Sequence, residues 1–358
     1  MKLRHHSALL RRTGIGLGAL TALAGVAGAV FVHRMNSYED PWKERVSAAD
    51  YVLRTAPVNG VELSYAEGPD NGPPLVLLHA QHMDWFSYSR VLPALAQRFH
   101  VYDIDYPGHG ATVTPTGYPM TATRIGTDLA DFIETRIGEP AYVTGNSSGG
   151  LLATWLAANR PRTVRAVLLE DPPLFSSEAG RIGGTIADRS FATSADAVRD
   201  GTDDFLLYWI DHSGKFFDNN VFRGAGDLLT QGVRLFRWGN PGEPVELGFL
   251  KNDTVRLLVR GLDEYDPRFG TAFHDGTWNQ GFDHATALAD IDCPVLLLQA
   301  DYTVLPDGTL NGAMTRPDAE RAASLLKHGT YRRIDATHVV HLDRPEQFTR
   351  ILEDFFLG

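Results

Sequence analysis

"TGNSSGG", residues 144–150, places two serines between glycines at the end of a short apolar stretch that is typical of a buried strand. The apolar residues 151–159 (LLATWLAAN) follow at once and have the character of a helix. Residues 145–149 therefore satisfy the pattern G-x-S-x-G between a predicted strand and a predicted helix, which is the context of a nucleophile elbow. The turn of such an elbow is so sharp that only small residues fit on either side of the central residue, here Ser147.

A serine at this position points to nucleophilic catalysis. Its hydroxyl is a poor nucleophile at neutral pH, so it needs a histidine to accept its proton and an acid to orient that histidine. The first N–H groups of a helix have no partner within the helix, and they favour a developing negative charge. We therefore predict Ser147 as the nucleophile and the N–H group of Ser148 as one donor of an oxyanion hole.

Strands and helical stretches alternate along most of the chain after residue 57. Apolar runs such as residues 73–80 and 293–300 are typical of strands that are covered on both faces, and residues 121–138 carry apolar side chains at helical spacing. This alternation predicts an α/β protein with a mostly parallel sheet and helices on both faces. The segment from about residue 172 to residue 290 lacks this rhythm and is dense in aromatic residues.

Two loops, together with the elbow, make the chain from about residue 58 to residue 358 resemble the α/β-hydrolase superfamily. LLHAQHMDWF, residues 77–86, resembles the loop after the family's third strand. That resemblance implies that the N–H group of Gln81 is the second oxyanion donor, with Ala80 where the family has glycine. DIDYPGHGAT, residues 103–112, resembles a turn of the family that is mainly structural.

The resemblance implies the α/β-hydrolase fold, with a mostly parallel sheet, helices on both faces and a largely helical cap between strands six and seven. The family covers many chemistries, so the fold alone does not give the substrate. The chain is expected to divide into a signal or membrane anchor (1–35), a connector (36–57), the hydrolase core (58–171 and 291–358) and the cap (172–290).

The catalytic histidine is assigned through the C-terminal stretch ATHVVHLDRPEQF, residues 336–348. This stretch resembles the family's motif around its catalytic base, and His338 stands at the family position. His338 is therefore predicted as the general base. His341, three residues further on, is the competing candidate.

The acid that orients the histidine is left open between two strand ends. The family usually carries it after the seventh strand, but Thr303 stands at that position here, with Asp301 and Asp307 nearby. The other known placement follows the sixth strand, where this chain has Glu170 and Asp171. We predict Asp171 as the acid, with Asp301, Glu170 and Asp307 as alternatives.

The substrate pocket is expected to be apolar. Aromatic residues crowd the predicted cap, and a pocket walled by them suits an apolar or aromatic acyl or alcohol group. Beside the oxyanion loop, His79, Trp85 and Phe86 are predicted pocket residues, and His79 is also expected to support the loop by hydrogen bonding.

These residues predict a serine hydrolase that cleaves a carboxylic ester or lactone of a small molecule through an acyl-enzyme. No metal or organic cofactor is expected, because the sequence contains no H-E-x-x-H, C-x-x-C or phosphate-loop motif. A cofactor-free haloperoxidase or a carbon–carbon bond hydrolase would use the same residues. A non-catalytic ligand-binding protein on the same scaffold is the alternative from a different class.

The N-terminus differs from the rest of the chain. Residues 1–12 are basic, and residues 15–32 contain no charge over a length close to the lower limit for spanning a bilayer. This pattern predicts either an export signal, with residues 27–29 (AGA) as a cleavage motif, or an uncleaved membrane anchor. Both place the catalytic domain outside the cytoplasm. The formal net charge of −11 argues against a nucleic acid partner.

Overall fold

The computed structural model describes residues 37–213 and 224–358. The predicted signal or anchor, with its apolar residues 15–32, lies outside these described residues. Within them, no helix is both long and apolar enough to cross a membrane.

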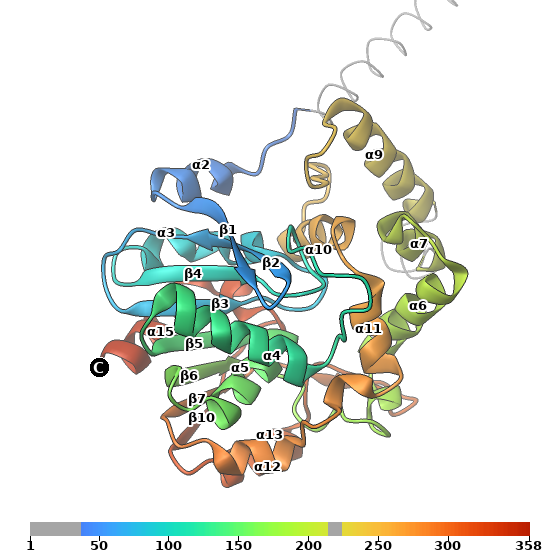
Figure 1. Ribbon diagram of the computed structural model, residues 1–358. Helices are drawn as coiled ribbons and strands as arrows, with labels where there is room; N and C mark the ends of the chain where they lie inside the picture. The colour runs from blue at the N-terminus through green and yellow to red at the C-terminus, as the bar shows by residue number, and fades with distance from the viewer. Residues whose placement is uncertain (1–36, 214–223) are drawn as a thin grey trace, which may run out of the picture.

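An eight-stranded sheet forms the centre of the described chain (Figure 1). Its strands are β1 (Val52–Val58), β2 (Val61–Glu67), β3 (Pro74–Leu78), β4 (His100–Asp105), β5 (Ala141–Asn146), β6 (Val164–Glu170), β7 (Val295–Gln299) and β10 (Gly329–Arg333). The order in the sheet is β1-β2-β4-β3-β5-β6-β7-β10. β2 is antiparallel to both β1 and β4, and all pairs from β4 to β10 are parallel. The mostly parallel sheet that the sequence predicts is thus confirmed.

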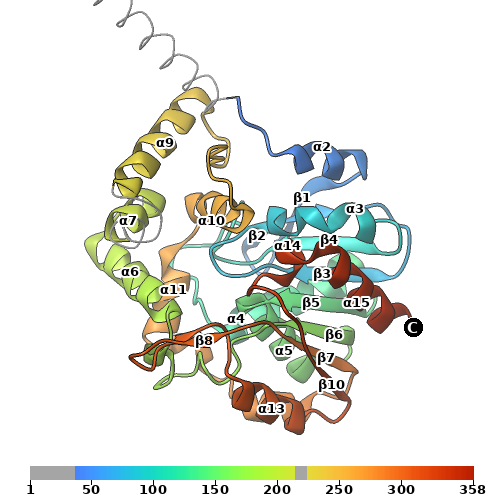
Figure 2. The same cartoon turned by 180° about the vertical axis from the view of Figure 1, so that it is seen from behind.

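Helices cover both faces of this sheet (Figure 1 and Figure 2). Side chains alternate along each strand, so that Val76 of β3 enters one core and Leu77 enters the other. The first core is closed by α4 (Ala122–Phe132), which continues as the single π-helical turn η2 (Ile133–Ile137), and by α5 (Ser148–Asn159) and α13 (Arg316–Leu325). The second core is closed by η1 (Trp85–Arg90), α3 (Leu92–Leu95), α14 (Val340–Asp343) and α15 (Pro345–Leu357).

The described residues between β6 and β7 are largely helical, and most of them stand beside one end of the sheet (Figure 1). They form η3 (Ile182–Gly184), α6 (Ala187–Asp200), α7 (Phe205–His212), α9 (Ala225–Gly239), α10 (Asp253–Asp263), α11 (Pro267–His274), η4 (Thr277–Asn279) and α12 (His284–Asp290). α12 packs against α5 and α13, which cover the sheet. The range 172–290 that was predicted as the cap therefore includes one helix of the core.

The stretch predicted as a connector, residues 36–57, is a correction to the sequence analysis. It contains α2 (Pro41–Ala48) and most of the edge strand β1. α2 begins after Asp40, whose side chain accepts a hydrogen bond from the backbone N–H group of Trp42. The first four residues of β1 are exposed, so neither element shows the apolar pattern by which buried elements are recognised.

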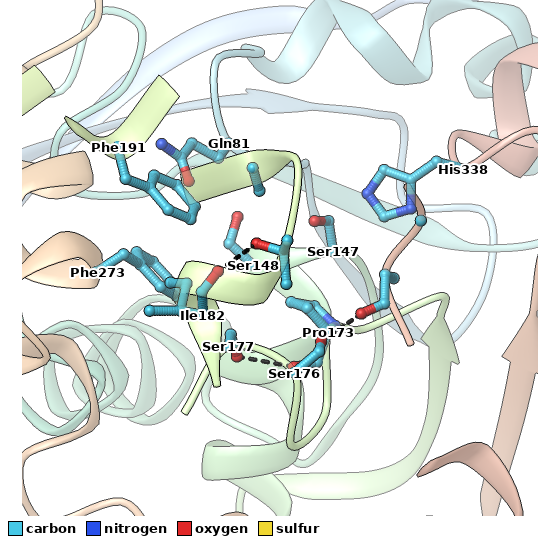
Figure 3. Close-up of a pocket in the computed structure, with 14 residues that line it drawn as sticks. Gln81, Ser147, Ser148, Pro173, Ser176, Ser177, Ile182, Phe191, Phe273 and His338 are labelled. Carbon is cyan, nitrogen blue, oxygen red and sulfur yellow. Dashed lines mark hydrogen bonds between the residues drawn. The ribbon is translucent and has the colours of Figure 1, made fainter. Parts of the chain in front are cut away.

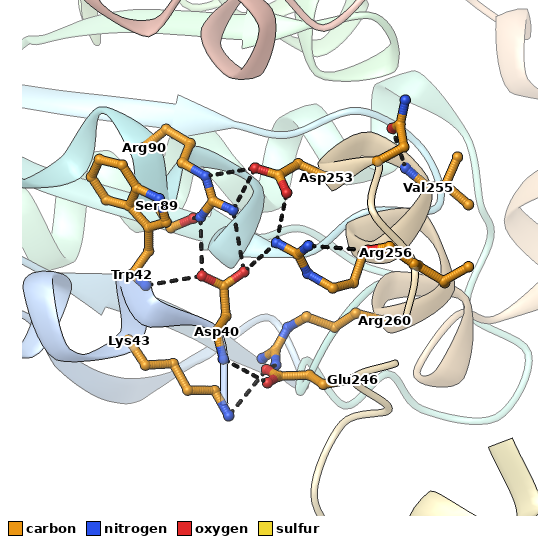
Figure 4. A network of polar contacts seen from close by, with 12 residues as sticks. Asp40, Trp42, Lys43, Ser89, Arg90, Glu246, Asp253, Val255, Arg256 and Arg260 are labelled. Carbon is orange, nitrogen blue, oxygen red and sulfur yellow. Dashed lines mark hydrogen bonds and ion pairs between the residues drawn. The ribbon is translucent and has the colours of Figure 1, made fainter. Parts of the chain in front are cut away.

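A buried network of ion pairs joins the residue before α2 to the cap helix α10 (Figure 4). Asp40 accepts from Arg90 of η1 at 3.2 Å and from Arg256 of α10 at 2.7 Å. Beside it, Arg260 of α10 pairs with the buried Glu246 at 2.7 Å. The network therefore ties Asp40 before α2 to η1, which covers the sheet, and to the cap helix α10.

Candidate active site

Ser147 lies on the sharp turn between β5 and α5, with a φ of 56° and a ψ of −119°. A positive φ is costly for a residue with a side chain, and such strain clusters at functional sites. The flanking glycines allow the turn: a Cβ on Gly145 would lie 2.2 Å from the carbonyl oxygen of Gly149, and a Cβ on Gly149 would lie 2.2 Å from that of Leu78. The turn therefore has the geometry of the elbow that the sequence predicts.

His338 and Asp171 meet beside this turn. Nδ1 of His338 lies 2.7 Å from Oδ2 of Asp171. The other carboxylate oxygen of Asp171 accepts a hydrogen bond from the backbone N–H group of Ala300 at 3.1 Å. The side-chain amide of Asn146 donates to the carbonyl oxygen of His338 at 3.0 Å. Because Asp171 occupies Nδ1, the second ring nitrogen is left for the cavity that His338 shares with Ser147.

Two of the alternative acids, Asp301 and Asp307, have other partners. Asp301 pairs with Arg333 at 3.4 Å, and both side chains are exposed. Asp307 accepts a hydrogen bond from the backbone N–H group of Thr309 at 3.0 Å within an exposed turn. The structure brings Asp171, and neither of these two residues, into hydrogen-bond contact with His338.

Glu170, the third alternative acid, binds the competing histidine. Its two carboxylate oxygens each lie 2.9 Å from Nδ1 of His341, and one of them also accepts the backbone N–H group of His341 at 3.0 Å. Both side chains are fully buried, and the ring of His341 stacks on Tyr88 at 3.9 Å. His341 therefore belongs to the core, and the cavity beside Ser147 is bordered by His338 instead.

The surroundings of His338 shift its proton affinity. Burial lowers the pKa of His338, but the hydrogen bond and the negative charge of Asp171 raise it, and the net shift is upward. The charge of Glu170 acts in the same upward direction. An imidazole in this setting is a stronger base than free histidine, and its protonated form is stabilised.

The predicted oxyanion donors, Gln81 and Ser148, both line the cavity beside Ser147. Ser148 is the first residue of α5, so its N–H group has no partner within the helix. The hydroxyl of Ser148 lies 2.8 Å from that of Tyr106, which engages this second serine in the core. The side chain of Gln81 donates to the hydroxyl of Tyr265 at 2.7 Å and so joins the oxyanion loop to the cap.

The cavity beside Ser147 is small (Figure 3). Its volume is about 70 Å³, well below the roughly 300–1,000 Å³ of common ligand pockets. In the described chain no hydrogen bond joins the hydroxyl of Ser147 to His338, and bonds of this kind often tighten only when a substrate binds. The cavity is lined by Gln81, Ser147, Ser148, Pro173, Ser176, Ser177, Ile182, Thr185, Ala187, Phe191, Phe273, Gly312, Ala313 and His338.

The predicted pocket residues His79, Trp85 and Phe86 do not line this cavity, so that prediction is wrong. His79 is fully buried, and burial lowers its pKa to about 4. Its Nδ1 lies 2.8 Å from the carbonyl oxygen of Ala80, which agrees with the expected support of the loop. Trp85 and Phe86 pack into the second core of the sheet. Apolar residues beside a loop serve a core or a pocket equally well, and sequence alone does not separate the two.

Other cavity residues come from segments without a recognisable motif. Phe191 of α6 and Phe273 of α11, whose rings stack at 5.0 Å, are two of the many aromatic residues of the predicted cap. Ser176 and Ser177 follow β6, and Gly312 follows the short hairpin after β7. No sequence signal distinguishes these five residues from their neighbours.

The sequence profile of the alpha/beta hydrolase family matches residues 75–351. This range is more than half of the chain, and it contains the parallel strands, the elbow at Ser147 and the pair formed by His338 and Asp171. The chain belongs to the alpha/beta hydrolase family, as its resemblance to that family implies.

The proteins similar to this chain are named for different activities. The chain is 25% identical over 303 residues to a putative 2-succinyl-6-hydroxy-2,4-cyclohexadiene-1-carboxylate synthase of Bacillus subtilis, which covers 83% of this chain and 95% of that protein. It is 34% identical over 105 residues to a pimeloyl-(acyl-carrier protein) methyl ester esterase of Chromobacterium violaceum, but this match spans 29% of this chain and 39% of that protein. A hydrolase from Pseudomonas aeruginosa PA01 has a crystal structure with a TM-score of 0.61 and 21% identity, over 87% of this chain and 99% of that one.

Proposed function

We propose that the protein is a serine hydrolase that cleaves a carboxylic ester or lactone of a small molecule. Ser147 is the nucleophile, His338 the general base and Asp171 the acid. The observation that carries this proposal is the hydrogen bond of 2.7 Å between His338 and Asp171 beside a serine held at a φ of 56°. The methyl ester esterase among the similar proteins supports ester chemistry. The reaction needs no metal or organic cofactor.

In the first half of the reaction, the hydroxyl of Ser147 attacks the carbonyl carbon while His338 accepts its proton. Asp171 stabilises the imidazolium that forms. The N–H groups of Gln81 and Ser148 donate to the oxyanion, and each donor of this kind typically contributes about 3 kcal/mol to lowering the barrier. His338 then gives its proton to the leaving alkoxide, and the acyl group stays on Ser147.

In the second half, a water molecule gives a proton to His338 and attacks the acyl-enzyme. The tetrahedral intermediate collapses, the carboxylic acid leaves, and His338 returns the proton to Ser147. The raised pKa of His338 helps it to accept both protons, and the acceptor role requires that it be neutral when each cycle begins.

A carbon–carbon bond hydrolase or a cofactor-free haloperoxidase with the same three residues is the second candidate. The relative that covers 83% of this chain is named a putative synthase, which favours a test of substrates beyond simple esters. A protein of this second kind would turn over carbon–carbon or halogenation substrates in preference to simple esters, with the same dependence on Ser147.

The test is hydrolysis of p-nitrophenyl esters, from acetate to palmitate, by the full chain and by Ser147→Ala. We expect short-chain esters to be cleaved best because the cavity beside Ser147 is small. We expect Ser147→Ala to lower kcat at least about 1,000-fold. Ser47→Ala, which changes an exposed serine of α2, is the matched control. Equal activity of the wild type and of Ser147→Ala would overturn the proposal.

We also propose that residues 15–32 export the chain or anchor it in a membrane, because this uncharged run follows a basic segment. Cells that express the full chain are compared by fractionation with cells that express a variant lacking residues 2–36. The full chain is expected in the membrane or the periplasm. Its recovery in the cytosol together with the shortened variant would contradict the proposal.

A further inference from the structure

A second, larger cavity also borders His338. It has a volume of about 400 Å³ and shares His338 and Gly312 with the cavity beside Ser147, but none of the other lining residues. Its walls come from the hairpin of β8 (Thr303–Val304) and β9 (Leu310–Asn311), from residues 335–338 after β10, and from Asp343 and Arg344 at the end of α14. The small cavity beside Ser147 is called the inner cavity below, and this second one the outer cleft.

The hairpin leads into Gly312, which borders both spaces. Gly312, which follows it, packs so closely that a Cβ there would lie 2.4 Å from that of Tyr302. On the other side, the backbone N–H group of Ile186 in the cap donates to the carbonyl oxygen of Leu310 at 2.9 Å, so that the hairpin bridges the core and the cap (Figure 2). Gly312 and His338 each border both spaces, so the two spaces meet beside the imidazole-bearing residue.

The mechanism assigns one half of an ester to each space. Gln81 and Ser148 line the inner cavity, so the carbonyl oxygen and the acyl chain lie on that side. His338 must protonate the leaving oxygen, so the alcohol half lies against its imidazole. Building on the proposed function, we propose that the inner cavity binds the acyl half of the substrate and that the outer cleft binds the alcohol half.

The inner cavity sets the character of the acyl half. Ile182, Phe191 and Phe273 make its wall largely apolar, and its volume of about 70 Å³ has room for a short chain. Burial of such a chain favours binding as long as the chain fits. The acid released by the reaction is therefore short and apolar.

The outer cleft sets the character of the alcohol half. It is lined by Asp301, Asp335, Asp343 and Arg344, and Asp301 is also paired with Arg333 at 3.4 Å. Asp343 is held by Arg344 at 2.8 Å and by the backbone N–H group of Thr337 at 2.8 Å. Carboxylates accept hydrogen bonds from hydroxyl groups and repel anions. The substrate class is thus an ester of a short acid with a larger, uncharged alcohol that carries free hydroxyl groups.

The test compares two acetate esters, monoacetin (the glycerol ester) and methyl acetate, by titration of the acid that the full-chain enzyme releases. We expect a higher kcat/KM for monoacetin. Thr303→Trp fills the outer cleft from β8 and is expected to lower the ratio of the two kcat/KM values about tenfold. Val304→Trp is the matched control: its side chain is 56% exposed, it points to the other face of the same strand, and it should keep the ratio.

Asn311→Trp repeats the test from the opposite strand, because Thr303 and Asn311 are paired across the hairpin. Thermal melting of each variant identifies a variant that fails to fold. A folded cleft variant that keeps the wild-type ratio overturns the assignment of the outer cleft. Ser147→Ala separates this result from a failure of the proposed function: hydrolysis of both esters that survives Ser147→Ala overturns the function itself.

Discussion

Asp171 and Glu170 are neighbours in the chain, yet they bind two different histidines. One histidine borders a cavity and the other is buried in the core. β6 ends at Glu170, and the backbone turns at Asp171 with a φ of 45°, so that the two side chains point to different sides. Asp171 therefore meets His338 at the edge of the inner cavity, while Glu170 meets His341 in the core. A histidine that borders a cavity can exchange protons with a substrate, and a fully buried one cannot. At the residue scale, the position of one carboxylate thus selects the base.

Asp171→Asn tests this selection because it keeps the size of the side chain and removes its charge. An amide at this position no longer stabilises the imidazolium and can hold the wrong tautomer of His338, so we expect kcat to fall about 10,000-fold. The measurement is hydrolysis of p-nitrophenyl acetate. Asp307→Asn, in an exposed turn, is the control and should keep kcat within about twofold. A fall of less than tenfold in Asp171→Asn would remove Asp171 from the proposed triad.

The pH dependence of kcat/KM follows from the upward shift of the pKa of His338. A protonated imidazole cannot accept the proton of Ser147, so activity is present above this pKa and is lost as the pH falls through it. We expect the acidic limb of the profile to have its midpoint above 6.5, the usual pKa of histidine. In Asp171→Asn the charge that raises the pKa is gone, and the midpoint should move to lower pH. A midpoint that is the same in both proteins would contradict the assignment.

At the scale of elements, α2 and α10 are joined by charges rather than by apolar contacts alone. Asp40 stands before α2 and binds Arg90 and Arg256, both of which are buried. Burial alone would raise the pKa of the Asp40 carboxyl, but its hydrogen bonds from Trp42 and from the two arginines give a net lowering. The carboxylate is therefore ionised at neutral pH, and its negative charge compensates the buried guanidinium groups of the two arginines.

Asp40→Ala should destabilise the protein, because it leaves two buried guanidinium groups with one partner fewer. Breaking a buried ion pair on one side costs about 3–5 kcal/mol. The free energy of unfolding is measured by urea denaturation. Glu44→Ala, an exposed acid on the same helix, is the control and should change stability by less than about 0.5 kcal/mol. Equal stabilities of the two variants would show that the network does not hold α2 and α10 in place.

At the scale of the whole molecule, stability depends on histidines that fold in their neutral form. His284, at the start of α12, accepts the backbone N–H group of Phe175 on Nδ1 at 2.9 Å, and its Nε2 faces the side-chain oxygen of Asn279 at 3.1 Å. Burial lowers the pKa of His284 to about 4, although the charge of Asp283 acts upward. Protonation of Nδ1 would remove the acceptor of the hydrogen bond from Phe175, so the folded state favours the neutral imidazole.

The unfolded chain binds a proton at this histidine near pH 6.5, and the folded chain does so near pH 4. Stability therefore falls as the pH decreases between these values, by up to about 1.4 kcal/mol per pH unit. His284→Gln does not titrate, so we expect its free energy of unfolding to fall about 2 kcal/mol less than that of the wild type between pH 7 and pH 5. The measurement is urea denaturation at both pH values. The same pH dependence in both proteins would refute the neutral, buried state of His284.

The order of strands and helices could be predicted because buried parallel strands are continuous apolar runs. Residues 73–80 and 293–300 contain β3 and β7, and the elbow at Ser147 has a motif that only a sharp turn explains. α2 and β1 could not be predicted, because an edge strand with exposed residues resembles a polar linker. The difference between these elements is burial. A buried strand has a continuous apolar sequence that can be recognised, and an exposed edge strand does not.

Some residues of the candidate site could be predicted from the sequence and others could not. Ser147 and His338 carry family motifs, and the structure places both at one cavity. The sequence predicts Asp171 ahead of three other acids, and the structure brings it within hydrogen-bond distance of His338. The pocket wall was the least predictable part, because side chains such as Phe86 fill the core and side chains such as Phe191 line the cavity without any difference in composition.

The most direct test of the central claim is the reaction of the full chain with a fluorophosphonate, followed by intact mass measurement and peptide mapping. An activated serine displaces fluoride from the phosphorus and keeps the phosphonyl group. The account predicts a single adduct on Ser147, its absence in Ser147→Ala and a much slower reaction in Asp171→Asn. An adduct on another serine, or no adduct on the folded protein, would contradict the account.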